Sequence, residues 1–210
     1  MPPDSYTFPT VNPELIAVIG AMVPVLIVLI WAGATYNRLV KLRYLIDNAW
    51  SNVDTELRRR YDLIPNLVDT VKAYAAHERA VFESVAQARA NAMNPALNTE
   101  EQAGRENELV RSLNSLFAVS EGYPQLKADQ NFLALQHELV NTEDRIQAAR
   151  RFFNGNVREY NTLVECFPSR ILAWLFGFDR RQYFEIEDAV RRAVISIEDD
   201  LRRAADPHDG

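Results

Sequence analysis

Two His-Glu dipeptides, His77-Glu78 and His137-Glu138, are the residues of this chain best suited to metal or acid-base chemistry. Helical bundles hold metals with Glu and His placed three residues apart on one helix, whereas adjacent residues diverge by about 100 degrees. The spacing therefore favours structural ion pairing, and Glu78, close to an apolar stripe, needs a cationic partner. A metal-binding or enzymatic helical bundle stays open as the alternative.

A basic run, Arg58 to Arg60 followed by Asp62, could bind a phosphate or a lipid headgroup. However, on a straight helix residue 58 would lie about 35 Å beyond the apolar N-terminal segment, far outside a Debye length of about 8 Å. We therefore expect these arginines to pair with acidic residues of neighbouring helices.

Other catalytic patterns are missing from the sequence. There is no Walker A motif, no nucleophile elbow, no dinucleotide-binding GxGxxG and no HExxH, and Cys166 is a lone thiol. With 23 basic against 29 acidic residues, the chain lacks the cationic surface that nucleic-acid binding requires. The sequence predicts a protein that is not an enzyme, with no cofactor, no metal, no nucleic-acid partner and no small-molecule substrate.

Residues 15–34 contain no charged side chain. At about 1.5 Å per residue they span about 30 Å, the thickness of a bilayer hydrocarbon core. Trp31 and Tyr36 stand at the exit, where aromatic side chains prefer the headgroup level, and membrane helices tolerate an internal proline such as Pro24. The sequence predicts a transmembrane helix over residues 15–35. The membrane is therefore the first partner that the sequence predicts, and this N-terminal helix is the anchor that binds it.

The charges on either side of this segment predict its orientation. Residues 1–14 carry no Lys or Arg, whereas Arg38, Lys41 and Arg43 follow the exit. Under the positive-inside rule the short N-terminus is extracellular and the bulk of the chain is cytoplasmic. The same three basic residues are candidate lipid headgroup contacts.

A cleavable signal peptide is the rival interpretation, because Ala32-Gly33-Ala34 resembles a cleavage site and cleavage would release a secreted product. The missing basic leader and the length of the apolar stretch favour anchoring.

The apolar period is helical from residue 36 onward, with no strand-like alternation. One stripe comprises Leu42, Ile46, Ala49, Val53, Leu57, Tyr61, Ile64, Val68, Val71, Ala75 and Phe82. It predicts a long amphipathic helix to about residue 90. Pro65 either kinks this helix, which we favour, or lies in the first turn of a new helix capped by Asp62 after a reversal.

Further helices follow. The start at Thr99 and the stop at Gly122-Tyr123-Pro124 predict a helix over residues 99–121. A coiled-coil-like heptad seam predicts a rod of about 40 residues that ends at Phe167-Pro168. Its leading positions are Phe132, Leu139, Ile146, Phe153, Tyr160 and Phe167. A final helix is expected over residues 185–203, and residues 205–210 are expected to be disordered.

The apolar segment 171–178, which includes Trp174, lies between the rod and the final helix. A first helix that continues through Pro65 would put Trp174 at the end far from the membrane, as a packed cap, which we favour, or as a partner surface. A reversal at Asp62 would instead bring the segment near the bilayer, where it could contact the membrane.

Several blocks of the sequence are similar to the LemA family of bacterial membrane proteins. They include residues 36–40 (YNRLV), 49–54 (AWSNVD), 57–68 (LRRRYDLIPNLV) and 120–127 (SEGYPQLK). The resemblance covers roughly residues 30–190, and it implies a single N-terminal span in the bacterial cell (inner) membrane and a helical bundle, without an established molecular function. The expected fold is all-α: a transmembrane helix, then an elongated antiparallel bundle of three to four long helices with a short C-terminal helical cap. The cytoplasmic LemA-like domain is expected over residues 36–204.

These features predict a membrane-anchored scaffold whose partner is an unknown protein or a second copy of the chain. The candidate interaction surface consists of Arg59, Asp62, Asn66, Lys72 and His77. A membrane-shaping structural protein remains a further alternative.

Overall fold

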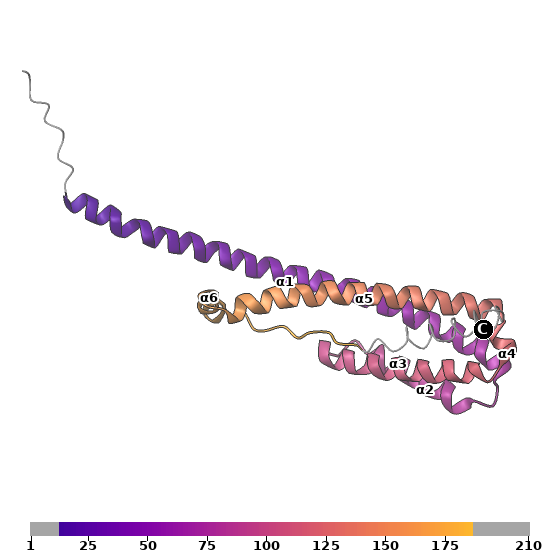
Figure 1. The fold of residues 1–210 in the computed structure, drawn as a ribbon. Coiled ribbons are helices and arrows are strands. Elements are labelled where there is room, and N and C mark those ends of the chain that lie inside the picture. Colours follow the sequence, from indigo (N-terminus) through magenta and orange to yellow (C-terminus); the bar gives the residue numbers. More distant parts are fainter. Residues whose placement is uncertain (1–12, 187–210) are drawn as a thin grey trace, which may run out of the picture. The chain divides into compact units, whose positions relative to one another are not determined.

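Helices form most of residues 13–186, the part of the chain that this computed structural model describes (Figure 1). In chain order they are α1 (Pro13–Tyr74), α2 (Arg79–Ala92), α3 (Thr99–Glu121), α4 (Pro124–Lys127), α5 (Gln130–Glu165) and α6 (Ser169–Leu175). No strand occurs among the described residues, so the all-α prediction is confirmed. The predicted N-terminal segment 1–14, final helix 185–203 and tail 205–210 lie largely or wholly outside the described residues.

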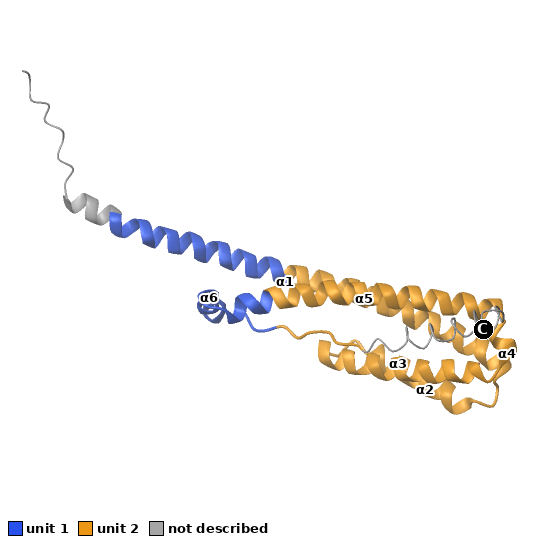
Figure 2. Cartoon of the chain, viewed as in Figure 1, with its two compact units in different colours: residues 1–43, 160–180 blue, residues 44–159, 181–210 orange. Residues whose placement is uncertain are grey.

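The chain divides into two compact units (Figure 2). Unit 1 comprises residues 1–43 and 160–180, and unit 2 comprises residues 44–159 and 181–210. The division falls inside α1 and α5, so each of these helices contributes to both units.

Unit 2 is a four-helix bundle with up-down-up-down order. Later residues of α1 contact earlier residues of α5: Arg59 pairs with Glu138, whereas Tyr74 hydrogen-bonds to Asp129. The contacts between α1 and α2 follow the same opposite order. Arg89 donates a hydrogen bond to the Tyr61 carbonyl, and the earlier Phe82 ring contacts the Lys72 ammonium group, which is later on α1. These pairs define an antiparallel arrangement, as short connections between sequential helices require.

The core of unit 2 follows the apolar stripe of each helix. On α1, Val53, Leu57, Ile64 and Val71 are all buried. The α3 side of the core is formed by Leu109, Val110, Leu113, Leu116 and Phe117, and the α5 side by Phe132, Leu139, Ile146, Phe153 and Val157. Burial of each side chain of this size stabilises the folded state by about 1.5–3 kcal/mol. Burial of the apolar stripes is therefore the main source of the stability of the bundle.

Helix α1 passes through Pro65 and ends at Tyr74. The alternative reversal at Asp62 is therefore wrong, and so is a single helix reaching residue 90. The chain reverses at residues 75–78 instead, and α2 then packs on α3. The apolar spacing from Val71 through Ala75 to Phe82 continues across this turn, because a straight helix and a helical hairpin bury the same positions.

Helix α3 spans the predicted residues 99–121. Its cap is Asn98 rather than Thr99. The Asn98 side chain accepts hydrogen bonds from the backbone amides of Glu100 and Glu101, and the Glu101 carboxylate accepts one from the Asn98 amide. This reciprocal capping box satisfies amides that have no partner within the helix.

Burial along α5 follows the predicted heptad through its first five leading positions, from Phe132 to Tyr160. The sixth, Phe167, is 81% exposed. The helix ends at Glu165, so the helical period no longer determines where the Phe167 side chain points. The prediction that the rod stops at Phe167-Pro168 is confirmed to within two residues.

Unit 1 contains the apolar part of α1 and the short helix α6. In the described chain one helix, α1, is long and apolar enough to cross a membrane. Core packing of the whole segment 171–178 is wrong: Ala173 and Phe178 are buried, but Trp174 is 82% exposed. The placement of this segment at the end far from the span is also wrong, since Phe176 and Phe178 contact Tyr36 through their rings.

Candidate functional site

A group of buried charges joins three helices of unit 2. The Arg60 guanidinium on α1 lies between two carboxylates, Glu106 of α3 and Glu143 of α5. Its Nη1 is 2.7 Å from a Glu143 oxygen, and its Nη2 donates to Glu106. The Arg60 and Glu106 side chains are completely buried. A charge in such surroundings requires compensation, which each ion pair supplies.

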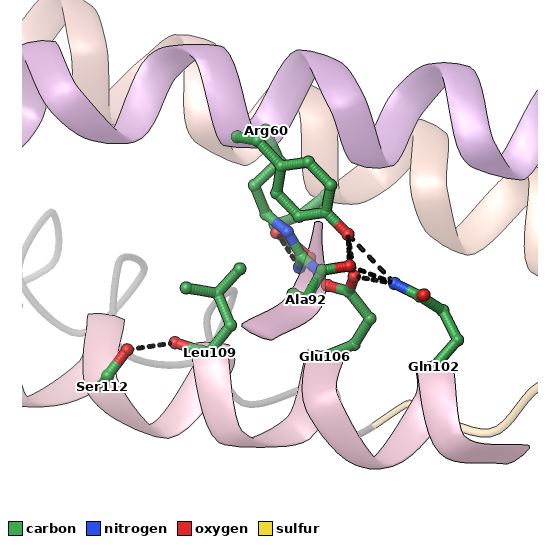
Figure 3. Close-up of polar contacts among 8 residues, drawn as sticks. Arg60, Ala92, Gln102, Glu106, Leu109 and Ser112 are labelled. Carbon is green, nitrogen blue, oxygen red and sulfur yellow. Dashed lines mark hydrogen bonds and ion pairs between the residues drawn. The ribbon is translucent and has the colours of Figure 1, made fainter. Parts of the chain in front are cut away.

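Two neutral side chains complete this group, which we call the buried polar centre: Arg60, Tyr61, Gln102, Glu106 and Glu143. The Tyr61 hydroxyl donates to Glu106. The Gln102 amide donates to Glu106 at 2.7 Å and to the Ala92 carbonyl at the end of α2 at 3.0 Å (Figure 3). Hydrogen bonds from these donors, added to the ion pairs, connect all four long helices of the bundle.

Within the buried polar centre, the pKa values of Arg60 and Tyr61 are shifted. Burial by itself lowers the pKa of Arg60, but the adjacent Glu143 and Glu106 outweigh it and raise the pKa above its ordinary value. Burial raises the pKa of Tyr61, and the Glu106 carboxylate raises it further. Arg60 therefore stays a cation and Tyr61 a neutral donor at physiological pH. With Arg60 and Glu106 shielded from solvent, this arrangement binds helix to helix.

The sequence contained a signal for these charges. Arg60 stands three residues after Leu57 and four before Ile64, so it occupies a position of the α1 apolar stripe. Likewise Glu106 precedes Leu109 by three, and Glu143 precedes Ile146 by three. A charged residue at an apolar position of the helical period indicates a buried ion pair.

The prediction that the basic run pairs with acidic residues of neighbouring helices is confirmed for Arg59 and Arg60 but is wrong for Arg58. Arg59 pairs with Glu138 of α5 at 3.2 Å and Arg60 pairs inside the core, whereas Arg58 pairs with Asp54 of its own helix at 2.8 Å. Three consecutive arginines thus have three different environments, because successive helix positions point about 100 degrees apart.

The candidate interaction surface is only partly brought together. Arg59, Asp62 and Asn66 are exposed and follow one another at steps of three and four, which places them on one face of α1. Lys72 lies elsewhere, 5.6 Å from the centroid of the Phe82 ring on α2 and 3.8 Å from Asp69. His77 is exposed in the turn between α1 and α2.

The candidate lipid contacts Arg38, Lys41 and Arg43 all lie on α1 in unit 1, and all three are exposed. Arg38 lies seven residues beyond Trp31, the last residue in a run of exposed apolar side chains that starts at Met22. About two helical turns therefore separate this apolar surface from the first basic residue.

The two His-Glu dipeptides lie in different settings. Glu78 is half-buried before the first turn of α2 without a side-chain capping bond, whereas Glu138 pairs with Arg59. His137 is exposed, and its Nδ1 is 3.1 Å from the amide nitrogen of Asn141. Within the described range, no group of three or more His, Cys, Asp or Glu residues is arranged to hold a metal ion.

A surface cavity lies beside the buried polar centre. Tyr61 and Gln102 contribute to its lining, and the Arg58–Asp54 ion pair also borders it. Its volume is about 200 Å³, below the roughly 300–1,000 Å³ of sites that enclose drug-sized ligands.

Comparison with known proteins extends the resemblance noted in the sequence. The chain is 26% identical over 186 residues to the magnetosome protein MamQ of Magnetospirillum gryphiswaldense, covering 77% of this chain and 68% of that protein. Magnetosome protein MamQ 2 of Paramagnetospirillum magneticum matches equally well. Protein LemA of Metamycoplasma hominis is 24% identical over 137 residues, covering 65% of this chain and 63% of that protein.

The model of the LemA family matches residues 49–198, which include the LRRRYDLIPNLV block and therefore the buried Arg60. Because this match covers well over half of the chain, the protein belongs to the LemA family.

Proposed function

We propose that this protein is a single-pass membrane protein whose helical bundle acts by contact, as a scaffold for a protein partner or for a second copy of itself. The observation that carries the proposal is the exposed polar face of α1, formed by Arg59, Asp62 and Asn66. Directly behind it, Arg60 fixes the same turn of helix to α3 and α5. A rigid helix that presents polar side chains at fixed spacing is a pre-organised binding surface.

The anchor in this proposal is residues 15–35. The large apolar side chains from Met22 to Ile30 are 50–66% exposed. Soluble monomers seldom expose a continuous apolar surface of this size, and a bilayer removes it from water. Anchoring also confines the bundle to two dimensions, which raises the effective concentration of whatever it binds.

The bundle is proposed to face the cytoplasm. The basic residues Arg38, Lys41 and Arg43 follow the apolar run, and residues 1–14 contain no Lys or Arg. Lys and Arg near a span are retained on the cytoplasmic side, where anionic headgroups attract them.

Contact rather than turnover is supported by how the charged groups are used. Glu106 and Arg60, which a catalytic site in the bundle core would employ, are paired with one another and shielded from solvent. A general base must reach a substrate proton through a hydrogen bond or one water molecule. The exposed polar residues of α1 instead lie on a convex helix face.

The test is purification of the full-length protein from native membranes with mild detergent. The charge reversals Arg59→Glu and Asp62→Lys are compared with the matched reversals Arg151→Glu on α5 and Glu83→Lys on α2, which are also exposed. We expect a stoichiometric partner, or a defined oligomer, that the first pair of variants loses and the control pair keeps. Recovery of every variant and of the wild type as a partner-free monomer would reject the scaffold role.

A further inference from the structure

Helix α6 and its flanks carry a group of exposed apolar side chains, which we call the α6 apolar face. Its members are Phe167 (81% exposed), Ile171 (57%), Trp174 (82%), Leu175 (64%) and Phe176 (53%). All five lie within ten consecutive residues of unit 1. A cluster of exposed large apolar side chains indicates a surface that binds a protein or a membrane.

The opposite side of α6 is packed. Ser169 and Ala173, four residues apart, are buried, and so is Phe178 just beyond the helix. The helix is therefore held in place by one side, which leaves Ile171, Trp174 and Leu175 of the α6 apolar face exposed.

The end of α6 brings two aromatic rings to α1. Gly177 adopts φ +67°, and the Phe178 amide donates to the Ala173 carbonyl at 2.8 Å, which is the hydrogen-bond pattern of a Schellman turn. The ring of Tyr36 on α1 then lies 4.9 Å from Phe176 and 5.7 Å from Phe178, centroid to centroid. These contacts fix α6 next to residue 36.

Residue 36 is two positions beyond the end of the apolar segment 15–34. Tyrosine and tryptophan side chains are enriched at this level, between hydrocarbon and water. Helix α6 has seven residues, about 10 Å in length, so it is far too short to span a core of about 30 Å. A helix held at this depth can lie along the membrane surface.

We propose that α6 inserts its apolar face into the interfacial region of the same bilayer that α1 crosses, as a second membrane contact. The inference rests on the proposed anchor, because the Tyr36 contacts define the depth of α6 only if α1 spans the bilayer. Lipid is the occupant because Phe176 of this face contacts Tyr36, which stands where the exposed apolar surface of α1 ends. Exposed Arg170 on α6, with Arg38 and Lys41 on α1, supplies cations for anionic headgroups.

The experiment uses the full chain reconstituted in phosphatidylcholine vesicles that contain a minor fraction of phosphatidylglycerol. The chain has three tryptophans, Trp31, Trp50 and Trp174. Replacing two of them with Phe in each variant leaves one reporter, and lipids brominated at different acyl positions measure its depth. Iodide in the buffer measures its exposure to water.

Trp31 reports on the anchor, Trp174 on α6, and Trp50 serves as the control because it packs against Phe153 and Phe184 inside unit 2. We expect Trp174 to emit at shorter wavelength than a water-exposed indole. Lipids brominated near the headgroup should quench it several-fold more strongly than they quench Trp50.

The outcomes separate the two proposals. Lipid quenching of Trp31 together with iodide quenching of Trp174 would overturn the α6 contact and leave the anchor intact. Absence of lipid quenching at both tryptophans would overturn the anchor and the α6 contact with it. Trp174 protected from iodide but not quenched by lipid would mean that protein covers the face, which also overturns the inference.

A substitution tests the same face without removing the reporter. Ile171→Asp and Leu175→Asp place charges beside Trp174, and both side chains are exposed, so neither disturbs the core. We expect these variants to lose most of the lipid quenching of Trp174. The matched control is Phe152→Asp on α5 in unit 2, whose 57% exposure equals that of Ile171. Equal quenching in all three variants would overturn the inference.

Discussion

Arg60 and Glu143 are 83 residues apart in sequence and form an ion pair of 2.7 Å in the core of unit 2. The same guanidinium also binds Glu106, so one side chain of α1 holds α3 and α5 in register. A buried ion pair adds little net stability compared with apolar packing, but removal of one partner is costly because the other charge stays buried.

The first prediction concerns that asymmetry. Arg60→Met leaves Glu106 and Glu143 in the core without their shared cation, so we expect a loss of about 3–5 kcal/mol in the free energy of unfolding. The measurement is urea denaturation of the full chain in detergent micelles, followed by circular dichroism.

Neutralising the stranded carboxylates should recover part of this loss. Combining Arg60→Met with Glu106→Gln and Glu143→Gln removes the buried negative charges and keeps the side-chain volumes. A single Arg60→Met variant as stable as the wild type would contradict the role assigned to the buried polar centre.

The second prediction is a pH dependence at the end of α1. The Phe132 amide donates to Asp129 and the Tyr74 hydroxyl donates to the same carboxylate, each at 2.9 Å. These hydrogen bonds, that of the Phe132 amide first, lower the Asp129 pKa below its ordinary 3.8. The Asp129 carboxyl group therefore binds a proton more tightly in the unfolded chain than in the folded protein. The stabilisation is fully present above the ordinary pKa and is lost as the pH falls through the folded-state pKa.

Asp129→Asn tests this linkage, because an amide can still cap a helix but does not titrate. Relative to the wild type, we expect the variant to be less stable near neutral pH, with the difference shrinking as the medium is acidified. Thermal unfolding of both proteins between about pH 6 and pH 3 measures it. A difference that is constant across this range would show that the Asp129 charge contributes nothing.

The third prediction contrasts two neighbouring arginines. Arg59 and Glu138 are 45% and 48% exposed and pair at 3.2 Å. Water screens such a pair, so Arg59→Ala should change the free energy of unfolding by less than about 1 kcal/mol. The measurement is the same urea denaturation as for Arg60→Met, which serves as the reference. A loss as large as that of Arg60→Met would mean that Arg59 is also part of the packed core.

The fourth prediction uses two glycines, Gly177 and Gly155, at which an added methyl group would meet no other atom within 4 Å. Gly177 has φ +67°, so Gly177→Ala should destabilise the end of α6 by about 1–2 kcal/mol through backbone strain. Gly155 lies within helix α5, where Gly155→Ala should stabilise by up to about 1 kcal/mol. Hydrogen exchange of residues 173–178 and 150–160 reads the two effects separately; faster exchange in both variants would contradict the assignment.

The fifth prediction tests the proposed topology. In a Cys166→Ser background, Ser5→Cys marks the N-terminal segment and Ser84→Cys marks an exposed position on α2. A membrane-impermeant maleimide should label position 5 in intact cells, and it should label position 84 only after permeabilisation. Labelling of position 84 in intact cells would reverse the proposed orientation.

The sequence by itself predicted the features that depend on local patterns. The heptad of α5 predicted that its leading positions from Phe132 to Tyr160 are buried. Helix α3 spans the predicted residues 99–121 and ends before Gly122-Tyr123-Pro124, although its cap is Asn98 rather than Thr99. Such signals lie within a few residues of the element they define, so no knowledge of distant contacts is needed.

The tertiary structure alone decided where the chain reverses, which carboxylates pair with Arg60 and where α6 lies. The helical period passes through the turn at residues 75–78 without interruption, so it could not distinguish one helix from two. The same period places Arg60 on the apolar stripe of α1, but only the packing of α3 and α5 decides that Glu106 and Glu143 are its partners. The added reversal at residues 75–78 also brings α6 beside Tyr36. All three outcomes depend on contacts between residues far apart in sequence, which a local pattern does not encode.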